Sequence, residues 1–146
     1  MDKELMLRIV LENPPPGIDF GLQKGSGNKY ETIQKQRSKD NDLNFELTVK
    51  IKNTASAQPI FLGPFVQGSS TERFIYIDIG RIAGQLNTVW SRRLKVPLVG
   101  ITHDMINKVL TGTNLLLEAK VPGTGKDGGP NCATVKPFGG WQLKVL

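Results

Sequence analysis

Hydrophobic and polar residues alternate with a period of two along most of the chain. The clearest stretch is NFELTVKIK, in which every second residue from Phe45 to Ile51 is apolar and the residues between them are polar. Such alternation puts the apolar side chains on one face of a β-strand and the polar side chains on the other. We therefore predict a half-buried strand of an antiparallel sheet here and in each further segment with the same pattern. These segments are LMLRIVLE at 5–12, RFIYIDIG at 73–80, RLKVPL at 93–98, LLLEAKV at 115–121 and WQLKVL at 141–146.

Three further segments with weaker alternation are also candidate strands, and two of the clearly alternating segments allow a more specific prediction. Pro97 has no N–H to donate to a ladder, so we expect the strand RLKVPL to lie at a sheet edge or to turn its proline nitrogen outward. In WQLKVL, the alternation places Trp141, Leu143 and Val145 on the inward face. The weaker segments are FGLQK at 20–24, YETIQ at 30–34 and IFLGPFVQ at 60–67, the last interrupted by Gly63 and Pro64.

One segment, GITHDMINKVLTG, has the features of a helix. Thr102 is a good N-cap, Asp104 falls in the first turn at the positive end of the helix dipole, and Gly112 follows the last turn. Ile101 and Ile106 have the spacing of a hydrophobic staple. We expect one short helix that covers an open end or a flank of the sheets.

These elements together predict an all-β fold. About eight strands, separated by turn signals roughly every eight to twelve residues, are typical of a sandwich or a small barrel. The chain has 146 residues, and no linker or internal repeat divides it, so we expect a single domain over residues 1–146. We favour an antiparallel β-sandwich, with a small β-barrel as the alternative.

Charge and composition limit the cellular compartment and the classes of partner that we expect, and they leave the predicted fold unchanged. The chain has 19 Lys and Arg residues against 13 Asp and Glu, a net charge of +6, which attracts anionic ligands or acidic partners in general and identifies none of them. Its single cysteine cannot form an intramolecular disulfide. The charged segment MDKELMLRIV is unlike a secretory signal, and no apolar run is long enough to span a membrane. We expect a soluble cytoplasmic protein.

The segment VPGTGKDGGPNC contains a G-x-G-x-x-G pattern formed by Gly123, Gly125 and Gly128. In dinucleotide-binding proteins these glycines open a helix directly after a strand. No helical pattern follows here, and the phosphate-binding loop G-x-x-x-x-G-K-[ST] is also incomplete, so we expect no bound dinucleotide. Two interpretations stay open: a nest of backbone amides that holds an anion beside Lys126, or a glycine-rich connection that only lets the chain turn.

Candidate catalytic residues are few. Cys132 and His103 are the only residues of their types, so a cysteine nucleophile would need His103 as its base. Asp78 and Tyr76 complete the candidates for a hydrolase or transferase with a site in a cleft of the sandwich. One histidine and one cysteine do not supply a zinc site, and no spaced acidic loop indicates calcium. We expect neither a metal nor a cofactor.

Basic residues cluster in two segments. One is SRRLK, with Arg92, Arg93 and Lys95. The other comprises Lys24, Lys29, Lys35, Arg37 and Lys39. Near this second cluster, only Tyr30 supplies an aromatic ring, whereas a nucleic-acid surface normally interleaves aromatic rings with basic residues or presents a reading helix. About three basic residues are also too few to anchor a protein on an anionic membrane. Neither nucleic acid nor a membrane surface is therefore indicated beyond the net charge.

The chain resembles a bacterial family of uncharacterised small proteins, a domain of unknown function. The resemblance implies no activity, cofactor or site residues. It covers nearly the whole length and is carried by LRIVLENPPPGIDFGLQKG, LGPFVQG, RFIYIDIG, SRRLKVPL and VPGTGKDGGPNCATVKPFGGW.

A weaker resemblance is to C2 domains, the eight-stranded sandwiches that often dock on membranes. The succession of LMLRIVLENPPPGIDFGLQKG, KYETIQKQ and NFELTV is similar to the first strands of that fold, with Asp19 where a loop aspartate often stands. The later paired aspartates that would hold calcium are missing, since YIDIGRIAGQ offers Asp78 alone. The resemblance therefore implies a C2-like fold without calcium-dependent lipid binding.

No complete catalytic set is visible, so we expect a binding module rather than an enzyme. The ligand or partner we expect is anionic, and the contacts we expect come from Arg92, Arg93, Lys95 and Lys126. Two other functions stay open: the hydrolase or transferase with a cleft site, and a structural or protein-interaction domain that uses an exposed strand edge.

Overall fold

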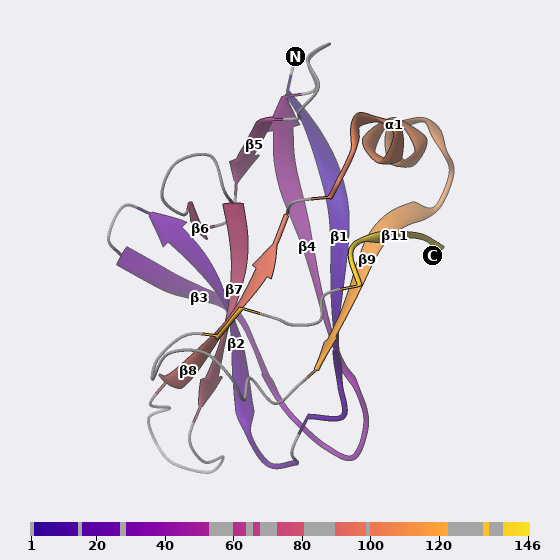
Figure 1. Ribbon diagram of the computed structural model, residues 1–146. Coiled ribbons are helices and arrows are strands. Elements are labelled where there is room, and N and C mark those ends of the chain that lie inside the picture. The colour runs from indigo at the N-terminus through magenta and orange to yellow at the C-terminus, as the bar shows by residue number, and fades with distance from the viewer. Residues whose placement is uncertain are drawn as a thin grey trace.

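Two β-sheets pack face to face in the computed structural model of the chain, and one helix lies beside them (Figure 1). Sheet A has the strand order β11-β9-β1-β4-β5, and sheet B has the order β10-β8-β7-β2-β3, with β6 beside β7. The predicted all-β sandwich is confirmed. The alternative of a small barrel is wrong, because no backbone ladder joins the two sheets among the described strands. The structure describes residues 2–14, 16–26, 29–52, 60–63, 66–67, 73–80, 90–98, 100–122, 133–134 and 139–146.

The strands follow the predicted segments closely, and most extend them by a few residues. RFIYIDIG coincides with β7, and IFLGPFVQ is divided into β5 and β6 as its interruption predicted. The strands of sheet A are β1 (Asp2–Glu12), β4 (Leu43–Lys52), β5 (Ile60–Gly63), β9 (Leu115–Pro122) and β11 (Gln142–Val145). Those of sheet B are β2 (Asp19–Ser26), β3 (Lys29–Arg37), β6 (Val66–Gln67), β7 (Arg73–Gly80), β8 (Trp90–Pro97) and β10 (Ala133–Thr134).

Two strand pairings are parallel within the otherwise antiparallel sandwich, a detail that the sequence did not predict. β1 runs parallel to β9, with Leu7 opposite Leu117, and β10 runs parallel to β8. A period of two records only which face of a strand is buried, and it is the same for both directions of pairing. β1 and β9 are also far apart in the chain, so no tight turn fixes their relative direction. The remaining pairings are antiparallel.

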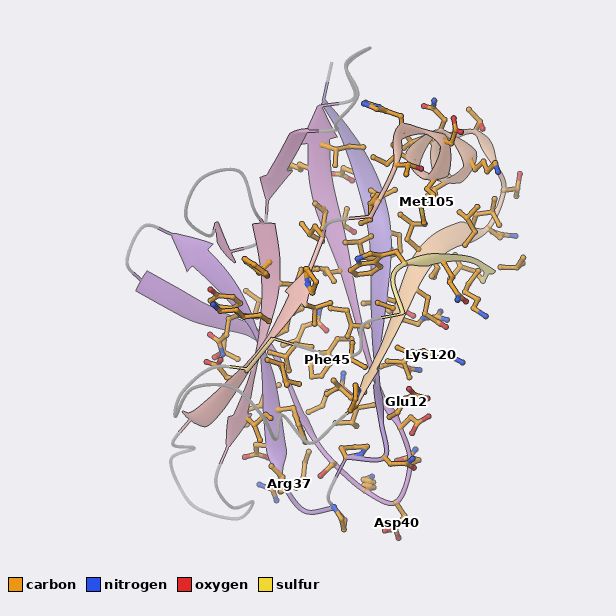
Figure 2. The ribbon with its side chains drawn as sticks, viewed as in Figure 1. Glu12, Arg37, Asp40, Phe45, Met105 and Lys120 are labelled. Atoms are coloured by element: carbon orange, nitrogen blue, oxygen red, sulfur yellow. The ribbon has the colours of Figure 1, made fainter. Side chains whose placement is uncertain are left out.

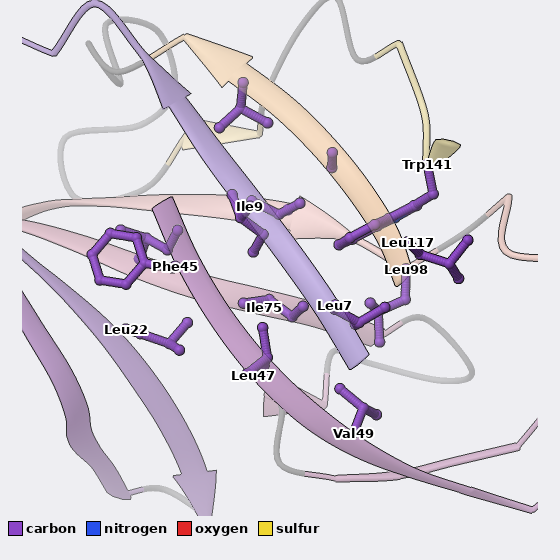
Figure 3. Close-up of a cluster of buried hydrophobic side chains, with 14 of the residues drawn as sticks. Leu7, Ile9, Leu22, Phe45, Leu47, Val49, Ile75, Leu98, Leu117 and Trp141 are labelled. Carbon is purple, nitrogen blue, oxygen red and sulfur yellow. The ribbon is translucent and has the colours of Figure 1, made fainter. Parts of the chain in front are cut away.

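Inward side chains of both sheets form one hydrophobic core (Figure 3). Trp141 is part of this core. Its indole Nε1 donates a hydrogen bond to the carbonyl oxygen of Pro97 at 2.9 Å, which holds the ring in place. The prediction that Val145 points inward is wrong, since its side chain is 75% exposed. Val145 forms the last pair of the edge strand β11, opposite Leu115, which is itself only partly buried. Core members labelled in Figure 3 are Leu7, Ile9, Leu22, Phe45, Leu47, Val49, Ile75, Leu98, Leu117 and Trp141.

Helix α1 (His103–Thr111) packs against β9 and β1 at one end of the sandwich (Figure 1). The predicted caps are confirmed: Thr102 Oγ1 accepts a hydrogen bond from the backbone N–H of Met105 at 3.2 Å, and the N–H of Gly112 donates to the carbonyl of Lys108 at 2.9 Å. Ile106 is fully buried, so the helix covers an end of the core. In the part of the chain that the structure describes, no helix has the length and apolar character needed to cross a membrane.

On one side of the sandwich, two glutamine side chains join β3 of sheet B to β4 of sheet A. Gln34 Nε2 donates a hydrogen bond to the carbonyl oxygen of Glu46 at 2.5 Å, and Gln36 Nε2 donates to that of Asn44 at 2.7 Å. β5 pairs with β4 only from Lys50 onward. The two hydrogen bonds of Gln34 and Gln36, which we call the glutamine bridge, therefore occupy backbone carbonyls along the part of β4 that β5 does not reach.

Candidate functional site

The outer face of sheet B, which is turned away from sheet A, carries charged, polar and aromatic residues, and its central residues Gln23, Tyr76 and Asp78 are buried. Because Ile75, Ile77 and Ile79 of β7 point into the core, residues 74, 76 and 78 lie on the outer face. The register continues this face across the sheet in two rows that run from β8 to β3. One row is Lys95, Tyr76, Gln23 and Thr32, and the other is Arg93, Asp78, Gly21 and Lys35.

At one end of this face, a single buried carboxylate contacts two cations. Asp19 is 2% exposed, and its Oδ1 lies 3.1 Å from Arg37 Nε, while its Oδ2 lies 3.9 Å from Lys35 Nζ. The two basic side chains are about half exposed, at 52% for Lys35 and 51% for Arg37. Arg37 lies at the lower end of sheet B in Figure 2. Solvent can therefore reach both basic side chains, whereas the carboxylate between them is buried.

Hydrogen bonds around Ser38 hold this cluster in place. Ser38 is buried, and its Oγ accepts a hydrogen bond from the backbone N–H of Ile18 at 2.9 Å. The backbone N–H of Gly17 donates to the carbonyl of Ser38 at 3.0 Å, and the N–H of Ser38 donates to the carbonyl of Ile18 at 2.8 Å. The start of β2 is thereby tied to the end of β3, which sets Asp19 opposite Arg37.

Further along the outer face of sheet B, a lysine lies beside two aromatic rings. Lys95 Nζ is 5.4 Å from the centroid of the Phe74 ring, a cation–π distance. The Phe74 and Tyr76 ring centroids are 6.4 Å apart, with the ring planes tilted by 35°. Tyr76 is buried, whereas Phe74 and Lys95 are partly exposed. Next to Tyr76, Gln23 Nε2 donates a hydrogen bond to Thr32 Oγ1 at 2.8 Å.

The outer face of sheet A has the opposite balance of charge around its central ion pairs. Arg8 lies 2.9 Å from Glu46 and 3.3 Å from Glu118, so one cation is shared by two carboxylates on the neighbouring strands. Burial acts to lower the pKa of the Arg8 guanidinium, but the hydrogen bonds to Glu46 and Glu118 outweigh it and raise this pKa above its ordinary value. This cluster carries no surplus positive charge for a ligand.

Comparison with known proteins identifies the family. The model of the Family of unknown function (DUF5990) matches residues 5–144, nearly the whole chain. The chain belongs to this family. Comparison with curated proteins and with solved structures found no match. The family resemblance seen in the sequence is thus confirmed, whereas the C2-like resemblance and a bacterial source stay predictions. Because the DUF5990 description assigns no activity, the function has to be argued from the geometry of the site.

The structure of this DUF5990 chain separates the predicted anion-binding residues. Lys95 lies on the outer face of sheet B, and the register places Arg93 on the same face, opposite Asp78. Arg92 is opposite the inward residue Ile79 and so occupies a position on the other face of β8. For Arg92 and Arg93 the backbone is described. Lys126 lies outside the described residues, so its proposed role stays a prediction.

The predicted catalytic residues fall on different parts of the DUF5990 fold. Tyr76 and Asp78 share the outer face of β7, where both are buried, at 7% and 3% exposure. His103 opens α1, which packs against β9 and β1 of the other sheet. Cys132 lies outside the described residues, so the Cys–His dyad stays a prediction. Among the residues that the structure places, no group of three or more His, Cys, Asp or Glu could hold a metal ion.

Sequence reasoning missed the association of Phe74 with the basic residues. Phe74 and Lys95 are 21 positions apart in the sequence, and only the pairing of β7 with β8 brings them together. It also missed the role of Asp19, which the C2 resemblance places in a loop and which instead begins β2 and pairs with Arg37. The alternation of RFIYIDIG already separates residues 74, 76 and 78 from the core, and this is the signal that could have been used.

Proposed function

We propose that this protein is a non-catalytic binding module that engages an anionic ligand or partner through the solvent-accessible basic residues of sheet B. The observation that carries the proposal is the placement of basic residues on both sides of one sheet face. Lys35 and Arg37 lie on β3, and Lys95 lies on β8, with β7 and β2 between them. Three interstrand spacings of about 4.8 Å separate β3 from β8 by about 14 Å. The outward residues Gln23, Tyr76 and Asp78 between these strands are buried, so the contacts with the ligand come from the basic side chains and not from the middle of the face.

One of the two basic side chains at Asp19 can be exchanged for a contact with a ligand. Lys35 and Arg37 are about half exposed, but Asp19 is buried, so removing both cations would leave a buried carboxylate without a partner, which is costly. Either side chain can turn toward a ligand while the other stays with Asp19. The net charge of +6 adds a general attraction that speeds the encounter with a polyanion.

Retention on immobilised heparin at low salt tests this proposal. Lys35→Gln and Lys95→Gln each remove one charge from the outer face of sheet B. Lys120→Gln removes the same charge from an exposed position of β9 on sheet A, and it is the matched control (Figure 2). We expect the two sheet B variants to elute at lower salt than the control. If the unchanged protein is not retained, or if all three variants elute together, the proposed binding face is refuted.

A further inference from the structure

We propose that a second copy of this chain pairs with the outer edge of β11, so that the A sheets of two subunits join into one continuous sheet about a twofold axis. This inference concerns sheet A and does not depend on the function proposed for sheet B. β11 is the last strand of sheet A, and no described strand pairs with its outer side (Figure 1). An edge strand of this kind presents a row of backbone groups with which another chain can pair.

The backbone groups that face this outer edge belong to Leu143 and Val145. The N–H of Leu146 donates a hydrogen bond to the carbonyl of Asn114 at 2.7 Å, one step beyond the pairing of Val145 with Leu115. In an antiparallel ladder, residues bonded to the neighbouring strand alternate with residues whose N–H and C=O point the other way. The even-numbered residues of β11 therefore bond to β9, and Leu143 and Val145 direct their N–H and C=O groups away from it.

The apolar row on the inward face of β11 continues beyond the core of one chain. Trp141 is buried, Leu143 is partly buried against the core, and Val145 is 75% exposed. An antiparallel pairing centred on Leu143 sets Val145 opposite the partner subunit's Trp141. The exposed end of each row then lies beside the packed end of the other, so the edge is complementary to itself, as a twofold dimer requires.

Charge favours the pairing centred on Leu143 over the one centred on Lys144. Centring on Leu143 places Lys144 opposite the partner subunit's Gln142, and Gln142 is opposite Glu118 within its own sheet. Glu118 is one of two carboxylates that share the single cation of Arg8, so the lysine of the second copy extends this row with a second cation. Centring on Lys144 would set two lysines directly opposite each other, which is unfavourable.

Sedimentation equilibrium over a series of protein concentrations up to about 1 mM tests the inference, because a short edge strand buries less surface than the roughly 1,600 Å² of a standard interface and gives a weak dimer. We expect the apparent mass to rise from 16.1 kDa toward twice that value. Val145→Pro removes a backbone donor that faces the partner and none that faces β9, and it should weaken dimerisation about fivefold or more. Val145→Thr keeps the donor and the branched shape, and it should weaken dimerisation less.

The matched control is Ile33→Lys, which changes another exposed apolar residue, 39% exposed, on the edge strand β3 of the other sheet. It should leave dimerisation unchanged. Thermal melting of each variant shows whether a loss of dimer reflects a loss of the fold.

Cysteine cross-linking in a Cys132→Ser background tests the register. Positions 142 and 144 of the two subunits face each other as a pair without mutual backbone hydrogen bonds, with Cα atoms about 4.5 Å apart, which is within the range of a disulfide. A mixture of Gln142→Cys and Lys144→Cys chains should form a covalent dimer on mild oxidation, and each variant alone should do so far more slowly.

A protein that keeps a mass of 16.1 kDa over the whole concentration series overturns the inference. A dimer that Ile33→Lys disrupts and Val145→Pro does not also overturns it, and so does rapid cross-linking of Lys144→Cys alone, which would centre the pairing on position 144. Retention on heparin is measured separately, so either proposal can fail while the other stands.

Discussion

Removing the glutamine bridge should loosen one side of the sandwich and expose a strand edge. The double variant Gln34→Ala and Gln36→Ala deletes both side-chain donors to the carbonyls of Glu46 and Asn44. An intramolecular hydrogen bond contributes about 0.5–1.5 kcal/mol net, so we expect the free energy of unfolding to fall by about 1–3 kcal/mol. For a chain of this length, that corresponds to a decrease in Tm of about 2–12 °C. Urea unfolding followed by circular dichroism, together with calorimetry, measures both quantities.

The bridge should also affect self-association, because an unpaired strand edge can pair with a second chain. Light scattering at increasing concentration should show more self-association for the double variant than for the unchanged protein. Gln34→Glu keeps the shape of the side chain but places a carboxylate oxygen, which cannot donate, against the carbonyl oxygen of Glu46. This variant should therefore be less stable even though its packing is unchanged. Gln142→Ala, at an exposed position of β11, is the control and should change stability by less than about 0.5 kcal/mol. A double alanine variant that matches this control in urea would show that the bridge carries no stability.

Three further predictions concern single contacts, each measured by urea unfolding. Thr102→Ala removes the N-cap of α1 and should destabilise the fold by about 1 kcal/mol, whereas Thr102→Ser should not; equal effects would refute a capping role. Trp141→Phe loses the hydrogen bond to the Pro97 carbonyl and should lower the free energy of unfolding by about 0.5–1.5 kcal/mol. The blue-shifted fluorescence of the buried Trp141 indole should be lost with it. Arg8→Leu leaves Glu118, which is 8% exposed, without its cation. We expect a loss of about 1.5–3 kcal/mol, and an unchanged free energy of unfolding would contradict a stabilising role of this ion pair.

The strands were predictable because each shows its buried face in the sequence. β4 alternates strictly, β1 and β7 alternate with a few apolar or aromatic residues on their outward side, and the predicted positions of all three agree with the structure within a few residues. β3 was harder to read, since Gln34 and Gln36 occupy inward positions where the pattern calls for apolar residues. Their donors reach backbone carbonyls of β4, so the polar side chains are satisfied without breaking the sandwich. The alternation of residues within β3 does not reveal that a strand of the other sheet supplies the hydrogen-bond acceptors for these side chains.

The candidate site was less predictable, because it depends on which strands become neighbours. Alternation assigns Phe74 and Lys95 each to a face, but it does not state that β7 and β8 pair in the register that sets them diagonally. Asp19 and Asp78 likewise lie on adjacent strands only through the pairing of β2 with β7. Local signals such as the Thr102 cap were read correctly, since the groups involved are three residues apart.

The position of β1 in sheet A has a consequence for how the chain folds. β1 is a central strand, with β4 on one side and β9 on the other. The pairing with β9 joins Leu7 to Leu117 and so closes a loop of about 110 residues. Contacts between such distant residues slow folding, because the entropy of closing the loop is lost before the contact forms. During synthesis, β1 and β4 can pair early, but the other edge of β1 has to wait until residues 115–122 have left the ribosome. Until then, this edge stays open to pairing with another molecule.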